Sequence, residues 1–209
     1  MPRVIYKNAE GKRLQGWTTI IGDNLAWNKR QLMIWANNIG LEGKKLSEYT
    51  QAMDIGTVTH QMVEADLKGI KFDTKYIAKE ILDKAENGFL AWLEWKSQVQ
   101  FELLKSECSL VSETWQFGGT IDIVALVKGL PAIIDIKTGD TYPDHLIQIR
   151  GYAELWNDNF PEQKIQSYYL LRLGKEDGSF SYHYHPQLDD YWEIAKLLLE
   201  LNKFKKKVD

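Results

Sequence analysis

The chain has 209 residues, and its 26 Lys and Arg residues against 29 Asp and Glu residues give a formal net charge of −3. Hydrophobic residues make up 44% of the chain and charged residues 26%, which excludes an intrinsically disordered protein and allows a sizeable core. The acidic total argues against a protein that coats nucleic acid nonspecifically, although a local basic groove can coexist with it.

The cysteine content and the N-terminal residues set the expected compartment. A single cysteine, Cys108, excludes an internal disulfide and any four-cysteine metal site built by this chain alone. Residues 1–13 lack the apolar run of a signal peptide, and no stretch approaches the roughly 20 apolar residues of a membrane span. We therefore expect a soluble, cytoplasmic protein.

The N-terminal half is predicted to be mainly helical. A short segment from Trp17 precedes a helix over about 25–39, where apolar residues recur at helical spacing. Two further helices are predicted, over about 58–67 and 76–104, and the last of these has a broad apolar face.

After residue 107 the pattern changes to short β-branched runs. Strands are predicted over 110–117, 120–127 and 132–137, with breaks at Gly118–Gly119 and at 128–131. Glycine-rich breaks between such runs indicate antiparallel strands joined by tight turns.

The C-terminal part alternates helix and strand. A helix over about 144–156 precedes two strands over 166–173 and 179–185, and an amphipathic helix over about 188–205 ends the chain. The four lysines of residues 203–207 would either stabilise this helix end through its dipole or contact DNA phosphates.

This order predicts an α+β (α/β) fold, with a mixed central β-sheet flanked by helices and a helical N-terminal lobe. We find no internal repeat or linker, so a single domain over 1–209 is the simplest description. Within it we expect the helical lobe at 1–105, the sheet core at 106–185 and the C-terminal helix at 186–209.

The candidate chemistry lies on two neighbouring strands. Asp135 and Lys137 are two residues apart, so both side chains leave the strand on the same face. Asp122 lies on the preceding strand across a short turn, where its carboxylate can approach that of Asp135. Two carboxylates that repel each other favour a divalent cation, and oxygen ligands suit Mg²⁺ or Mn²⁺.

Such a site suits phosphodiester hydrolysis. The metal neutralises a phosphate oxygen and activates water, while Lys137 either orients that water or stabilises charge in the transition state. An isolated Asp-x-Lys on a strand is usually a solvated surface feature, and only the combination of several motifs favours catalysis.

The combined pattern resembles the PD-(D/E)XK nuclease superfamily, in its RecB-like exonuclease branch. A G-x-x-D motif, a D-x-K motif and a helical Q-x-x-x-Y motif follow an upstream G-x-x-x-H, and the resemblance covers about residues 18–173. The matching residues are Gly56, His60, Gly119, Asp122, Asp135, Lys137, Gln148 and Tyr152. The resemblance implies a restriction-endonuclease-like core.

By this resemblance, the metal ligands are His60, Asp122, Asp135 and the Ile136 carbonyl, and the catalytic residues are Asp122, Asp135 and Lys137. Some RecB-like relatives bind an iron–sulfur cluster through four cysteines, and the single cysteine here predicts that the cluster is absent.

For three further candidate site residues, more than one role is possible. Gln148 and Tyr152, four apart on a helix, would orient Lys137 or contact DNA phosphate, or would simply pack. Glu113, on the strand before Asp122, is a possible additional acidic member.

The N-terminal segment resembles the entry segment of the mitochondrial genome maintenance and phage exonucleases of this branch. The resemblance implies DNA-backbone contacts, which would be made by Thr18, Thr19, Lys29 and Arg30. Trp17 and Trp27 are candidates for stacking on unpaired bases.

The resulting hypothesis is a Mg²⁺- or Mn²⁺-dependent DNA exonuclease that acts on free, single-stranded ends in replication, recombination or repair. A phage-type origin would fit the compact domain. The alternatives are a structure-specific or restriction-like DNA endonuclease and a catalytically inactive DNA-binding module.

Overall fold

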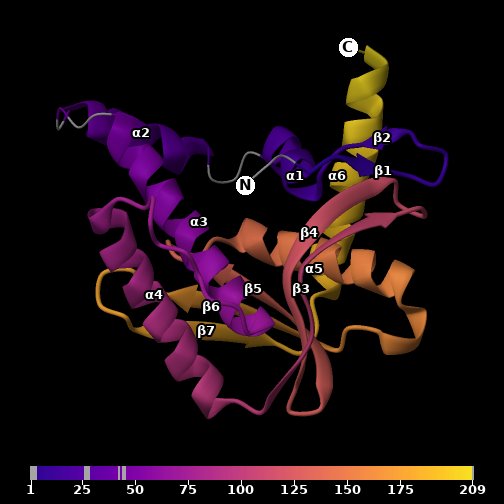
Figure 1. Ribbon diagram of the computed structural model, residues 1–209. Helices are drawn as coiled ribbons and strands as arrows, with labels where there is room; N and C mark the ends of the chain where they lie inside the picture. Colours follow the sequence, from indigo (N-terminus) through magenta and orange to yellow (C-terminus); the bar gives the residue numbers. More distant parts are fainter. Residues whose placement is uncertain (1–3, 26–28, 42, 44–45, 209) are drawn as a thin grey trace.

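The computed structural model describes residues 4–25, 29–41, 43 and 46–208 (Figure 1). Its helices are α1 (Trp17–Asn24), α2 (Lys29–Leu41), α3 (Leu46–Lys68), α4 (Lys79–Gln98), α5 (Pro143–Asn159) and α6 (Asp189–Val208), with a 3₁₀ turn at Pro161–Gln163. Its strands are β1 (Tyr6–Lys7), β2 (Arg13–Leu14), β3 (Phe101–Ser112), β4 (Phe117–Val127), β5 (Leu130–Lys137), β6 (Ser167–Leu173) and β7 (Phe180–His185).

The central sheet has five strands in the order β3-β4-β5-β6-β7. All neighbouring strands are antiparallel except β5 and β6, which run parallel because α5 connects them across the sheet. Strands β1 and β2 form a separate small hairpin. The mixed sheet flanked by helices confirms the predicted fold class.

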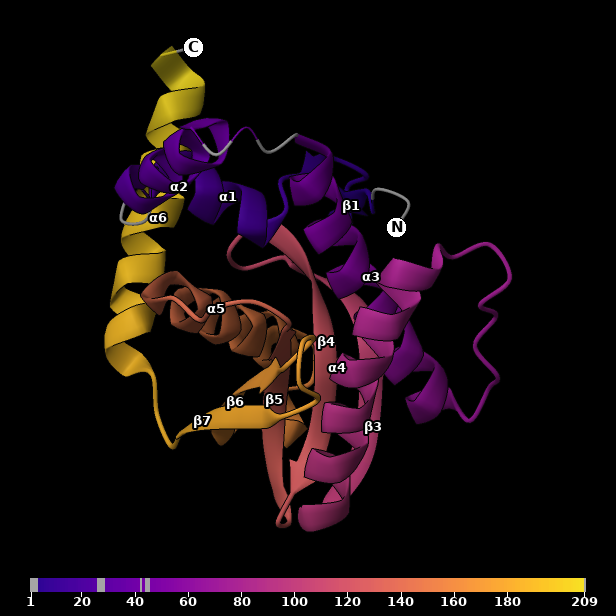
Figure 2. The ribbon, with the colours of Figure 1, turned by 90° about the vertical axis from the view of Figure 1, so that its left-hand side faces the viewer.

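Helices cover both faces of the sheet (Figure 2). On one face α3 and α4 pack against apolar side chains that include Ile134 and Ile136, and the buried Trp92 and Trp95 lie in this layer. On the other face α1, α5 and α6 pack against side chains that include Ile133. None of the described helices is both long and apolar enough to cross a membrane.

A two-residue turn joins β4 to β5. Lys128 and Gly129 both have positive φ, at 52° and 80°, and Val127 pairs with Leu130 on either side of them. Positive φ at both central residues is the signature of a type I′ turn, whose twist matches that of the strands. The predicted break at 128–131 is confirmed at 128–129 and is wrong at 130–131, which already belong to β5, and the turn fixes the register of the hairpin.

The break predicted at Gly118–Gly119 is wrong, because both glycines lie inside β4 and the turn comes before them, at 113–116. A Cβ at Gly118 would lie 2.2 Å from the Tyr6 ring, and one at Gly119 would lie 2.8 Å from Leu155 Cδ1 and 2.9 Å from the Tyr152 ring. These positions need glycine because other segments pack directly on the backbone.

The predicted helix over 76–104 is wrong at its C-terminal end. Helix α4 stops at Gln98 and β3 begins at Phe101. Leu103 packs on the α3–α4 side of the sheet and Leu104 on the α5 side, a two-sided burial that suits a strand.

The N-terminal helices also differ from the prediction. Residues 17–24 form α1, so the segment before the predicted helix over 25–39 is itself helical. Helix α3 is longer than the predicted helix over 58–67, because it already begins at Leu46.

Candidate active site

The site begins where the ladder between β4 and β5 stops. The last described backbone pair is Ile123 with Ile134, so Asp122 and Asp135 are the next two residues on the facing strands. Asp122 Oδ2 accepts a hydrogen bond from the Ile136 backbone N–H at 2.9 Å. The carboxylate thus links β4 to β5 just beyond their last paired residues.

The alternation of faces changes at Asp122. Ile121 packs in the core beneath α5, whereas Ile123 packs in the core beneath α3 and α4, although two residues apart would normally share a face. Across the β3–β4 ladder the unpaired position facing Asp122 is Glu107, which has a φ of 46°. A positive φ is uncommon for a residue with a side chain and concentrates at functional sites.

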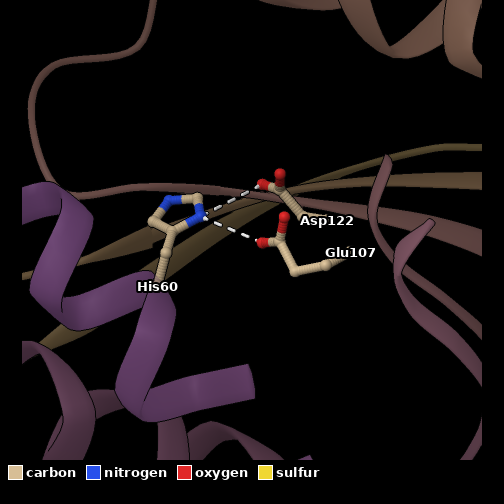
Figure 3. A group of neighbouring side chains, drawn as sticks. All are labelled: His60, Glu107 and Asp122. Atoms are coloured by element: carbon tan, nitrogen blue, oxygen red, sulfur yellow. Dashed lines mark ion pairs between the residues drawn. The ribbon is translucent and has the colours of Figure 1, made fainter. Parts of the chain in front are cut away.

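This irregularity brings together a cluster of three ligand-type side chains (Figure 3). His60 Nδ1 lies 3.8 Å from Asp122 Oδ2 and 4.0 Å from Glu107 Oε1, and all three groups offer ligand atoms within 4.8 Å of one another. Burial by itself would lower the pKa of His60, but the Asp122 and Glu107 carboxylates raise it above its usual value. The cluster therefore attracts positive charge.

Helix α3 reaches the cluster because of Gly56. A Cβ at Gly56 would lie 3.0 Å from Thr138 Oγ1, just past the end of β5. His60 lies one turn further along α3, on the same helix side. The Gly56-x-x-x-His60 spacing thus has a physical reason. The glycine allows α3 to lie close to the end of β5, and the histidine one turn later then reaches Asp122 and Glu107.

The donor set fits a divalent cation. Two ligand atoms that each lie about 2.1 Å from Mg²⁺ can be at most about 4.2 Å apart. The distances from His60 Nδ1 to Asp122 Oδ2 and to Glu107 Oε1, 3.8 and 4.0 Å, are both below that limit. Carboxylate oxygens suit Mg²⁺ and Mn²⁺, and an imidazole nitrogen shifts the preference toward transition metals.

Asp135 and Lys137 form a second group on the α5 side. Lys137 Nζ lies 2.6 Å from Asp135 Oδ2, and the Asp135 side chain is only 1% exposed. Burial raises the pKa of Asp135, and the Lys137 ammonium opposes that rise. Burial would lower the pKa of Lys137, but the carboxylates of Asp135 and Asp122 raise it, so the ammonium stays charged.

Gln148 and Tyr152 extend this group along one side of α5. Gln148 Nε2 donates to Asp135 Oδ1 at 3.2 Å and also to Tyr152 Oη at 3.1 Å. Burial, followed by the charges of Asp122 and Asp135, raises the pKa of Tyr152 well above its usual value, so its hydroxyl stays protonated. Gly119 leaves room for the Tyr152 ring.

His145, one turn before Gln148, borders the same group. Its Nδ1 accepts a hydrogen bond from the Tyr142 backbone N–H at 3.1 Å. Burial lowers the pKa of His145, and the charge of Lys137 lowers it further. An acceptor at Nδ1 and a neutral ring together assign the remaining proton to Nε2. No role for His145 is predicted from the sequence alone.

The structure brings five predicted residues together, and it adds one that sequence reasoning missed. The five are His60, Asp122, Asp135, Lys137 and Gln148, with Tyr152 packed behind them. The missed residue is Glu107, which fell between the predicted helix ending at 104 and the predicted strand starting at 110. Its signal is its register position, since it faces Asp122 across the hairpin.

Glu113 was placed wrongly by the sequence analysis. It lies in the turn after β3, and its Oε1 accepts a hydrogen bond from the Ala9 backbone N–H at 2.6 Å. It therefore ties the N-terminal hairpin to the β3–β4 turn, and it is not a member of the His60 cluster.

The remaining predicted contacts lie on the N-terminal lobe. Thr18 and Thr19 are exposed in the first turn of α1. Lys29 and Arg30 begin α2, with side chains outside the described part of the structure, and Trp27 lies outside the described residues. Trp17 cannot stack on a base, because it is fully buried and its indole N–H donates to the Gln148 carbonyl at 3.1 Å.

No protein-family model matches the chain, and no curated protein sequence matches it either. A crystal structure from Eubacterium rectale named "Putative exonuclease" is similar, with a TM-score of 0.51 and 18% sequence identity over 80% of this chain and 70% of that chain. The two chains share an α/β fold. At this identity the likeness describes architecture, and the chemistry rests on the site itself.

Proposed function

We propose that this protein is a metal-dependent nuclease that hydrolyses DNA phosphodiester bonds from free ends, with single strands as the preferred substrate. The observation that carries the proposal is the approach of the His60, Glu107 and Asp122 cluster to the buried Asp135–Lys137 pair, just beyond the last paired residues of β4 and β5. The similarity in fold to a protein named as an exonuclease supports it.

His60, Glu107 and Asp122 would hold the cation, with the Asp135 carboxylate and the Ile136 carbonyl as further ligands implied by the motif. Bound there, Mg²⁺ or Mn²⁺ would neutralise a non-bridging phosphate oxygen and lower the pKa of a water molecule. The imidazole in the donor set favours Mn²⁺ over Mg²⁺.

Lys137 would supply the positive charge that the transition state requires. Its ammonium stays protonated between Asp135 and Asp122, at a point where phosphate charge would develop. Gln148 would keep the Asp135 carboxylate oriented through its hydrogen bond, and the protonated Tyr152 would in turn orient the Gln148 amide.

The test is degradation of end-labelled single-stranded DNA with Mn²⁺ by the wild type and by Lys137→Ala. We expect a rate loss on the order of 10²- to 10³-fold, as for the removal of one transition-state donor in other enzymes. Lys71→Ala, which removes an exposed lysine in the connection after α3, is the matched control and is expected to leave the rate unchanged. Equal activity of the wild type and Lys137→Ala would refute the proposal.

Closed circular single-stranded DNA tests the requirement for an end. An exonuclease leaves the circle intact while it degrades the linear form of the same sequence. If the circle is cut at a rate comparable to that of the linear form, the protein is an endonuclease and not an exonuclease. The proposed metal-dependent chemistry would be unaffected by that result.

A further inference from the structure

A groove of about 430 Å³ lies between the N-terminal hairpin, the start of α1 and the end of α6. Figures 1 and 2 both show α1 beside α6 in this region, away from α4. The groove is lined mainly by polar and charged side chains, including Arg13, Thr18, Thr19 and Lys206, with Tyr6 in one wall. It shares no lining residue with the cluster of His60, Glu107 and Asp122.

A network of side-chain amides fixes the walls of the groove. Gln15 Nε2 donates to Asp23 Oδ2 at 3.0 Å, and Asn202 Nδ2 donates to Gln15 Oε1 at 3.1 Å. Asn24 Nδ2 donates to Asn202 Oδ1 at 3.3 Å. Because these contacts join the residue after β2 to α1 and α6, the groove is preformed and does not need a ligand to assemble it.

The groove combines cations with hydroxyl donors, which is the chemistry that recognises a phosphodiester backbone. Neither Arg13 nor Lys206 forms an ion pair with a described carboxylate. Residues 4–25 and 200–208 contain seven Lys and Arg residues against three Asp and Glu residues, in a chain whose total is acidic. The positive charge is therefore concentrated around this groove.

The groove is connected to the candidate active site through β4. Tyr6 Oη and Thr120 Oγ1 are 3.0 Å apart and share a hydrogen bond. Thr120 precedes Asp122 by two residues, which span about 7 Å along a strand. In addition, the Trp17 indole donates to the carbonyl of Gln148, so α1 is anchored on the helix that carries Gln148 and Tyr152.

We infer that this groove, referred to below as the Arg13–Lys206 groove, binds the backbone of a single DNA strand a few nucleotides away from the bond that is cut. Arg13 and Lys206 contact two successive phosphates, and the hydroxyls of Thr18 and Thr19 donate to the same backbone. The inference rests on the proposed function, because the strand in the groove is the one that reaches Asp122.

The experiment measures binding of a fluorescent oligothymidylate of about 20 nucleotides, a length that exceeds one binding site. Fluorescence anisotropy is recorded in EDTA, which prevents cleavage, over about 50 to 200 mM KCl. The full-length wild type is compared with Arg13→Gln/Lys206→Gln. Lys71→Gln/Lys79→Gln, which removes two exposed lysines beyond α3, is the control with the same change in net charge.

Each phosphate contact with a single strand contributes about 0.7 to the slope of log Kd against log salt concentration. The slope is expected to fall by about 1.4 in Arg13→Gln/Lys206→Gln and to stay unchanged in the control. Lys206→Gln alone, at the exposed end of α6, gives about half of that fall if the double variant does not fold. With Mn²⁺ present, the double variant is expected to raise KM for the strand and to leave kcat unchanged.

Three outcomes separate the two proposals. A reduced slope in the double variant supports the Arg13–Lys206 groove as a strand-binding site. A wild type that binds and cuts the strand, with the same slope in the double variant, overturns the groove assignment and leaves the nuclease assignment intact. A wild type that neither binds nor cuts DNA overturns both.

Discussion

The two sides of the candidate site differ in how their charges are balanced. On the α3 side, the ion pairs of Glu107 and Asp122 within 4.0 Å among the described residues are with the His60 imidazole, whose pKa they raise. The Asp122 charge also acts on Lys137, but less strongly than that of Asp135. On the α5 side, the Asp135 carboxylate already has the Lys137 ammonium and the Gln148 amide as partners. We therefore expect a cation to balance the first side, whereas the second already has an ammonium partner within the chain.

Acids on the two sides should therefore respond differently to substitution. Neutralising an acid on the α3 side should weaken metal binding and leave the fold intact. Removing a partner on the α5 side should leave a buried charge unpaired and therefore destabilise the fold.

Asp122→Asn is expected to lower kcat/KM by about 10³-fold or more, because it removes the carboxylate that the α3 side needs for the cation. The asparagine oxygen can still accept the Ile136 N–H, so the melting temperature should stay close to that of the wild type. Steady-state kinetics with Mn²⁺ and a thermal melt check both parts. Activity within tenfold of the wild type would remove Asp122 from the metal site.

Lys137→Met is expected to lower the free energy of unfolding by about 3 to 5 kcal/mol at neutral pH, the usual cost of leaving one member of a buried ion pair alone. Among the described side chains, Asp135 keeps Gln148 as its hydrogen-bond donor, and it remains buried. Urea denaturation measures the loss.

The double variant Asp135→Asn/Lys137→Met is the control for this prediction. It removes both charges and should recover most of the lost stability, though not the activity. A double variant as unstable as Lys137→Met would show that packing, and not the unpaired charge, causes the loss.

Glu107→Gln is expected to weaken Mn²⁺ binding at least about tenfold, or roughly 1.4 kcal/mol. The reason is that it removes one of the two carboxylates in the His60 cluster. Isothermal titration calorimetry with Mn²⁺ measures the change. Glu113→Gln is a matched control, since Glu113 bonds to Ala9 outside that cluster and should leave the affinity unchanged. Equal affinities in the two variants would exclude Glu107 as a ligand.

Asp158→Asn should have the smallest effect, on stability only. Burial would raise the pKa of Asp158, but hydrogen bonds from Ser112 and Thr114 outweigh it and lower the pKa. The lowered pKa means that the stabilisation is present above the unfolded value of about 3.9 and is lost as the pH falls through the folded value.

Because Asp158 is exposed, the loss in Asp158→Asn should be only about 1 kcal/mol at pH 7. The difference from the wild type should vanish at a pH below the folded pKa. Denaturation curves at neutral and acidic pH give the comparison. A constant difference at both pH values would contradict the assignment to the ionised carboxylate.

The sequence predicted the parts of the molecule that depend on regular periodicity. Apolar spacing and turn residues predicted helix α5, strands β5 to β7 and the mixed sheet. The predicted fold class is confirmed. The shared side of Asp135 and Lys137 follows from the two-residue repeat of a strand, and these two side chains do meet. The divalent metal, the DNA substrate and the subdivision at 105 and 185 remain predictions.

The parts that the sequence did not predict depend on contacts between distant segments. Gly118 resembles a turn residue in sequence, but its lack of a side chain makes room for the Tyr6 ring, which is more than a hundred positions earlier in the chain. Glu107 meets Asp122 through a local irregularity in β3 and β4, which no periodic pattern can reveal. The segment around Trp17 looks irregular in sequence, so the Trp17 side chain was expected to be exposed. It is buried instead, because Gly151 has no side chain and leaves space for the indole ring.

The type I′ turn at Lys128–Gly129 has a consequence for how the chain can change in length. One residue added to this turn would shift β4 against β5 by one position, and a shift of one position exchanges the two sides of a strand. Asp122 and Asp135 would then part, although neither had been mutated. The mostly exposed connection at 69–78 sets no strand register. We therefore expect an insertion at 69–78 to be tolerated, and an insertion at Lys128–Gly129 to abolish activity.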